Sequence, residues 1–114
     1  MNVLVVEKHI IVDFVEKEIR SRLGPHVFGS GSQTMESVVG EMLAQKGLTL
    51  SVAESCTGGL ISHLLTNVPG SSDYFQGGIT VYSNQSKVDL LGVSPETIRK
   101  HGAVSDQAVR EMAE

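Results

Sequence analysis

Residues 54–59, Glu-Ser-Cys-Thr-Gly-Gly, place two nucleophilic side chains beside two glycines. The segment lies between a predicted strand and a predicted helix, where α/β folds commonly bind ligands. The glycines allow backbone N–H groups to turn inward, and the helix that follows adds its positive end. This pattern predicts a cradle for an anion or an oxyanion. Its spacing matches neither the P-loop nor the dinucleotide-binding motif, and the alternative is an ordinary turn into a helix capped by Thr57.

A second segment, Tyr82-Ser-Asn-Gln-Ser-Lys87, carries a candidate base. Lys87 falls in the first turn of a predicted helix, where the positive helix end favours the neutral amine. A neutral lysine can act as a general base. Tyr82, at the end of a predicted strand, can orient that amine or donate a hydrogen bond. The alternative is a solvated surface lysine with a tyrosine in the core.

Cys56 is a rival nucleophile, with His63 two helical turns further along the chain. A cysteine in such a place can instead be a small buried side chain. The sequence contains no HExxH, no CxxC and no paired carboxylate–histidine pattern. It therefore predicts no metal site and no cofactor.

The spacing of apolar residues predicts the elements that position these segments. Thr34 is expected to cap one helix, Gly47 to end it, and Asn84 to cap a later helix. Helices are predicted at 8–23, 34–46, 60–66 and 85–91 and from residues 95 and 105, and strands at 48–53 and 76–83. This alternation predicts α/β layering. Two strands make a marginal sheet, so we expect the chain to be part of a larger domain.

The composition excludes several classes of protein. The chain has 114 residues, nine Lys and Arg, and thirteen Asp and Glu, for a net charge of −4. Without a basic face, direct binding of nucleic acid through phosphates is not expected. No apolar run is long enough for a membrane helix, and the start lacks the features of a secretory signal. The single cysteine excludes an internal disulfide, so a cytoplasmic setting is predicted.

Residues 29–33, Gly-Ser-Gly-Ser-Gln, form a linker by composition. We therefore place a domain boundary there. Residues 1–33 are predicted to be the tail of a preceding domain plus the linker, and residues 34–114 the first part of the next domain.

Four ordered motifs resemble a known family. They are Ala53-Glu-Ser-Cys-Thr-Gly-Gly59, Pro69-Gly-Ser-Ser72, Tyr82-Ser-Asn-Gln-Ser-Lys87 and His101-Gly-Ala-Val-Ser105. In this order they closely resemble the C-terminal domain of the CinA family, the nicotinamide mononucleotide amidase also called PncC. The resemblance covers residues 34–114, and residues 1–33 resemble the end of the domain that precedes it in full-length CinA proteins.

The resemblance implies a metal-independent amidohydrolase that converts nicotinamide mononucleotide and water to nicotinate mononucleotide and ammonia. It implies a three-layer α/β/α sandwich around a mixed sheet. The family's serine, lysine and tyrosine correspond to Ser55, Lys87 and Tyr82. The backbone of Thr57, Gly58 and Gly59 is then expected to hold either the oxyanion or the substrate phosphate, and Asn84 is assigned to substrate binding.

The family domain continues with a glycine-rich segment, further strands and a site arginine that this sequence lacks. We therefore expect an incomplete sandwich, low activity of the isolated chain, and association into homo-oligomers through exposed apolar faces and a sheet edge. The alternative function is a non-catalytic nucleotide-sensing or partner-binding module of a protein linked to competence and DNA damage. A purely structural subdomain is the third possibility.

Overall fold

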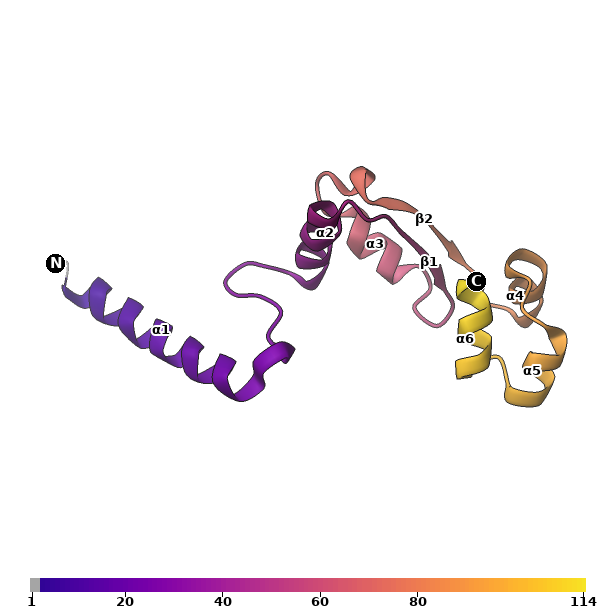
Figure 1. Cartoon of the computed structure of the whole chain (residues 1–114), viewed down its shortest axis with the longest axis horizontal. Helices are drawn as coiled ribbons and strands as arrows, with labels where there is room; N and C mark the ends of the chain where they lie inside the picture. Colours follow the sequence, from indigo (N-terminus) through magenta and orange to yellow (C-terminus); the bar gives the residue numbers. More distant parts are fainter. Residues whose placement is uncertain (1–2) are drawn as a thin grey trace. The chain divides into compact units, whose positions relative to one another are not determined.

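The computed structural model describes the backbone of residues 3–114 and the side chains of residues 10–114. Its elements are mostly helices, with two strands near the middle of the sequence (Figure 1). The chain divides into two compact units, residues 1–38 and 39–114, and each is described by itself. No helix in the described part is both long enough and apolar enough to cross a membrane.

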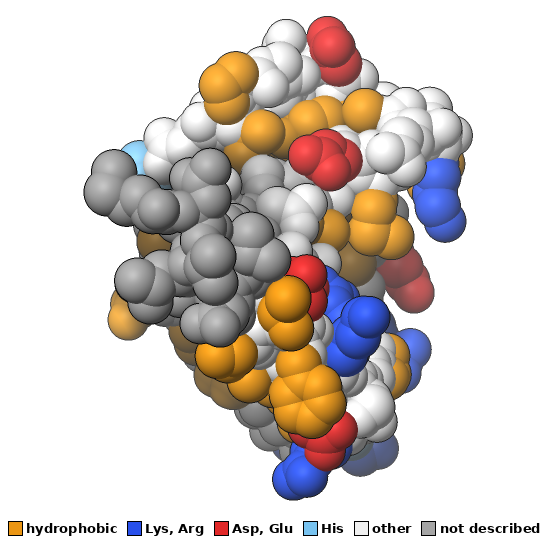
Figure 2. Space-filling model, turned by 90° about the vertical axis from the view of Figure 1, so that its left-hand side faces the viewer, with side chains coloured by type: hydrophobic (Ala, Val, Ile, Leu, Met, Phe, Trp, Pro, Cys, Tyr) orange, Lys and Arg blue, Asp and Glu red, His pale blue; other side chains and the backbone are white. Residues whose placement is uncertain are grey.

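The first unit contains helix α1 (Val3–Leu23), followed by the 3-10 turn η1 (Gly24–His26). α1 begins five residues before its predicted start. Two ion pairs lie on its surface, Arg20–Glu16 and Arg22–Glu18, and each joins residues one helical turn apart. Its apolar side chains are exposed as well, and Figure 2 shows apolar groups among charged ones on this surface. The described side chains of α1 therefore form no buried core within this unit.

Helix α2 (Met35–Lys46) begins and ends as its sequence predicts. Thr34 caps it, because its Oγ1 accepts from the Ser37 N–H while the Ser37 Oγ accepts from the Thr34 N–H. Gly47 adopts φ +61° after the last turn. The N–H groups of Gly47 and Leu48 donate to carbonyls of the last turn, so the helix ends in a Schellman motif.

Two parallel strands, β1 (Leu50–Glu54) and β2 (Phe75–Thr80), form the sheet. The connection between them carries helix α3 (Leu60–Thr66), which packs on both strands, and the 3-10 turn η2 (Ser71–Asp73). The sequence predicted both strands within three residues of their observed ends. β2 ends before its predicted end because the chain turns after Val81 to begin the next helix. The fold is therefore α/β, as predicted, and its described strands are parallel.

Three helices follow the sheet: α4 (Asn84–Leu91), α5 (Pro95–His101) and α6 (Asp106–Ala113). They lie at the carboxyl ends of the strands (Figure 1). The prediction that Asn84 caps α4 is wrong. Asn84 is the first helical residue, and the Ser83 side chain accepts from the Ser86 N–H. Both residues can cap helices, so composition alone did not distinguish them.

One cluster of buried residues lies between these helices and the strand ends. It consists of Val81, Val93 and Met112, with Ala53, Ile79, Leu91 and Ile98 packed around them. Glu111 links α6 to the start of α5, because its carboxylate accepts hydrogen bonds from the Thr97 hydroxyl and the Ser94 N–H. These hydrogen bonds lower the pKa of Glu111, while burial opposes the shift and the charge of His101 assists it.

A close helix–loop contact depends on Gly40 of α2. A methyl group at this position would lie 2.5 Å from the phenol oxygen of Tyr74, which is itself buried. In an exposed helix, Gly→Ala stabilises by up to about 1 kcal/mol. Here we expect Gly40→Ala to lower the free energy of unfolding by about 1–3 kcal/mol, because the core has no room for the added carbon. Urea denaturation would measure the change.

The neighbouring exposed residue provides a control, since Glu41→Ala should change stability little. In the described part of the chain the Tyr74 hydroxyl has no hydrogen-bond partner. Adding Tyr74→Phe to Gly40→Ala should therefore recover part of the loss. A Gly40→Ala protein as stable as the wild type would contradict the proposed contact.

Candidate functional site

Ser55 and Lys87 meet at the carboxyl end of the sheet. Ser55 directly follows β1, and Lys87 is the fourth residue of α4, which follows β2. The Val81 N–H donates to the Glu54 carbonyl at 2.8 Å, which extends the strand pairing up to Ser55. Lys87 is 2% exposed, and its Nζ lies 3.0 Å from Ser55 Oγ. The fold thus brings together two side chains that are 32 positions apart in the sequence.

Main-chain oxygens fix the position of the Lys87 amine. Its Nζ donates to the carbonyls of Val81 at 2.8 Å and Tyr82 at 3.2 Å. A protonated amine uses its third hydrogen on Ser55 Oγ. A neutral amine keeps both carbonyl contacts with its two hydrogens and presents its lone pair to the serine hydroxyl. The geometry therefore accommodates both ends of a proton transfer between Ser55 and Lys87.

Ser55 borders an open pocket of about 380 Å³. One wall is formed by the end of β1 and the turn after it. The other is formed by the turn before α6 and by α6 itself. The lining residues are Ala53–Thr57, Ala103–Asp106, Val109 and Met112. Lys87 does not line the pocket, so a bound molecule meets the serine hydroxyl, with the amine on its buried side.

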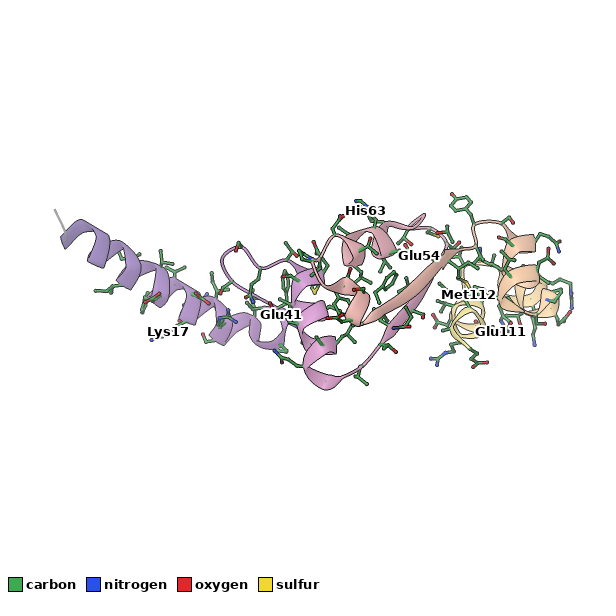
Figure 3. All side chains as sticks on the ribbon, turned by 90° about the horizontal axis from the view of Figure 1, so that it is seen from above. Lys17, Glu41, Glu54, His63, Glu111 and Met112 are labelled. Atoms are coloured by element: carbon green, nitrogen blue, oxygen red, sulfur yellow. The ribbon has the colours of Figure 1, made fainter. Side chains whose placement is uncertain are left out.

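Glu54 is a site residue that the sequence analysis did not single out. It is 2% exposed at the end of β1, next to α3 (Figure 3). Its carboxylate accepts from the Ile61 N–H at 3.0 Å, the Ser62 N–H at 2.8 Å and the Ser62 hydroxyl at 2.6 Å. Burial alone would raise its pKa, but these bonds and one from the Thr57 hydroxyl outweigh burial and lower the pKa to about 2. An acidic residue six positions before the start of a helix was the available signal.

This carboxylate changes the interpretation of the glycine turn. The positive end of α3 is already occupied by Glu54, so the predicted contribution of that helix end to an anion cradle is wrong. Gly58 and Gly59 have φ of +62° and +98°, the left-handed region that glycine tolerates. The Gly58 N–H is used within the turn, where it donates to the Ser55 carbonyl. Within the described part, the N–H groups of Cys56, Thr57 and Gly59 have no protein acceptor and remain available.

The helix α3 approaches the sheet closely because of a glycine in β2. A side chain at Gly78 would overlap the Ser62 hydroxyl, the same group that donates to Glu54. Gly78 therefore keeps Ser62, and through it the Glu54 carboxylate, in place beside the site.

Other predicted residues lie apart from the Ser55–Lys87 pair. Tyr82 reaches Lys87 through its carbonyl, while its side chain is 74% exposed. Asn84 borders a different hollow, between α4 and α5. Cys56 is exposed beside Ser55, and His63 pairs with the Asn67 amide. Among the residues that the structure describes, no hydrogen bond joins Cys56 to His63, and no group of three or more His, Cys, Asp or Glu is placed to hold a metal ion.

Comparisons with known proteins give a consistent result. Residues 32–114 match the family described as CinA C-terminal domain. A competence-damage inducible protein of Moorella thermoacetica is 56% identical over 87% of this chain and 24% of its own length. A CinA-like protein of Dictyoglomus turgidum is 50% identical over 95% of this chain and 26% of its own length.

A solved structure is similar as well. The competence/damage inducible protein CihA from Agrobacterium tumefaciens superposes with a TM-score of 0.66 at 44% identity, covering 68% of this chain and 47% of that chain. The chain thus spans about a quarter of the length of the curated relatives and about half of this solved chain.

Proposed function

Because the chain belongs to the CinA C-terminal domain family, we propose that its Ser55–Lys87 pair serves an amidase that converts nicotinamide mononucleotide to nicotinate mononucleotide and ammonia. The observation that carries the proposal is the 3.0 Å contact between a buried amine and a hydroxyl that borders an open pocket. A hydroxyl needs an adjacent base to act as a nucleophile, and Lys87 stands where that base is required.

The first half of the reaction forms an acyl-enzyme. The neutral Lys87 amine takes the proton of the Ser55 hydroxyl, and Oγ bonds to the carboxamide carbon. The tetrahedral oxyanion is stabilised by N–H donors, for which the free amides of the 56–59 turn are the candidates. As the C–N bond breaks, Lys87 returns the proton to the leaving nitrogen, which departs as ammonia.

The second half regenerates the serine. Lys87, neutral again, takes a proton from water, whose oxygen attacks the ester carbon. The C–Oγ bond breaks and Lys87 returns the proton to Ser55. The product is a carboxylic acid, which releases its proton to the solvent and so carries a carboxylate in place of the carboxamide. The carbonyls of Val81 and Tyr82 hold the amine throughout, so proton transfer requires little movement of the base.

Ammonia release from nicotinamide mononucleotide by the complete gene product tests the proposal. We expect turnover without added metal, and we expect Cys56→Ala to keep activity within about threefold of wild type, because no hydrogen bond among the described residues joins the exposed thiol to His63. Loss of turnover in Cys56→Ala with retention in Ser55→Ala would favour a thiol enzyme instead. Tight binding of the nucleotide with no turnover would favour a sensing module.

A further inference from the structure

The pocket beside Ser55 is lined by negative but not by positive side chains. Its charged lining residues are Glu54 and Asp106, and no Lys, Arg or His of the described chain lines it. The Lys87 amine lies behind Ser55 and is bound to two carbonyls. The charged side chains that border a ligand in this pocket are therefore negative, which favours a cation.

The two carboxylates are not equivalent. The oxygens of Glu54 are engaged by donors from α3. Asp106, in the first turn of α6, is exposed and accepts no hydrogen bond within the described part of the chain. Asp106 is thus the carboxylate left free to face a ligand.

The remaining lining residues supply apolar walls. Val104 is 84% exposed and Val109 is 56% exposed, although both border the pocket. Ala53, Ala103 and Met112 complete the apolar surface. A flat ring placed against these side chains would remove that surface from water.

We propose that Asp106 makes this pocket selective for a flat ring that carries both a permanent positive charge and a carboxamide. The inference rests on the proposed function, because the pyridinium ring of nicotinamide mononucleotide is such a ring. Coulomb attraction to Asp106 lowers the free energy of the bound cation, and the apolar side chains of the pocket contact the faces of the ring. The anionic phosphate then extends away from Glu54 and Asp106. Asp106 acts here as a specificity residue, without bonding to the reacting atoms.

Two carboxamides of the same shape isolate the effect of charge. The probe 1-methylnicotinamide is a cation, and 3-methylbenzamide is its neutral isostere, with carbon in place of the ring nitrogen. We expect the wild-type gene product to bind the cation about tenfold more tightly. Asp106→Asn should bring the two dissociation constants within about twofold, and Asp106→Glu should keep a preference. Asp73→Asn, an exposed residue outside the pocket lining, is the matched control and should behave as wild type.

Dissociation constants from NMR titration make the readout independent of turnover. A structural role of Asp106 at the start of α6 would change the melting temperature without changing the ratio of the two constants. Equal affinity for the two probes, no measurable binding of either, or a full preference in Asp106→Asn would overturn the inference. A preference that disappears in Asp106→Asn while the protein releases no ammonia would support the inference and refute the proposed function.

Discussion

Ser55→Ala is expected to slow ammonia release from nicotinamide mononucleotide by at least about 10⁴-fold, and Lys87→Met by about 10³-fold. Alanine removes the hydroxyl oxygen that the proposed reaction uses as its nucleophile. Methionine keeps the length and apolar stem of Lys87 but removes the amine that lies 3.0 Å from Ser55 Oγ. Because the two groups act on the same proton, the double variant should be no slower than Ser55→Ala alone.

Initial rates at saturating nucleotide, with circular dichroism to verify folding, would measure these effects. Lys100→Met changes an exposed lysine on α5 and is the matched control. Rates for Ser55→Ala and Lys87→Met within tenfold of wild type would exclude the pair as nucleophile and base. A double variant slowed by the product of the two single effects would show that the groups act independently.

Glu54→Gln is expected to cause a large loss of stability. The carboxylate accepts hydrogen bonds from two α3 amides and from the Ser62 hydroxyl. Glutamine offers one acceptor oxygen and turns an NH₂ group toward donors that remain buried. Urea denaturation at about pH 7 should therefore give a much lower free energy of unfolding than for Glu41→Gln, an exposed control of the same chemistry.

The same residue gives the stability a pH dependence of known sign. The pKa of Glu54 is about 2 in the folded chain, against an ordinary value of 4.5. The unfolded chain binds this proton first, so the contribution of Glu54 is complete above about pH 4.5 and is lost as the pH falls towards about 2. Glu54→Gln should flatten this slope, leaving the part due to Glu111, whose pKa is also lowered. Identical slopes in wild type and variant would contradict the assigned role.

Local patterns in the sequence predicted most of the fold. Thr34 and Gly47 bound α2 through hydrogen bonds among near neighbours, so residue types at fixed spacing were sufficient. The predicted helix at 60–66 coincides with α3. The strand ends were less well predicted, because where a strand ends depends on its partner. The choice between Ser83 and Asn84 as cap depended on a dihedral angle that composition does not encode.

The sequence predicted which segments carry the candidate site residues, but only part of how their side chains are arranged. Spacing identified the segments of Ser55 and Lys87, and the fold places these side chains in contact. The spacing of residues did not reveal that Tyr82 contacts Lys87 through its main-chain carbonyl, since every residue carries such a carbonyl. It also missed Glu54, whose partners in α3 are reached only when the chain folds back along the sheet.

The parallel register of β1 and β2 ties assembly of the site to one alignment of the two strands. Glu54 pairs with Thr80, and the chains leave the sheet just beyond this pair, towards Ser55 and Lys87. A slip by one residue would displace one strand by about 3.3 Å and turn Glu54 to the opposite face. A nascent or refolding chain with misaligned strands would therefore lack both the hydroxyl–amine contact and the anchor of α3. The strand alignment that anchors α3 through Glu54 is therefore the same alignment that brings the Ser55 hydroxyl to the Lys87 amine.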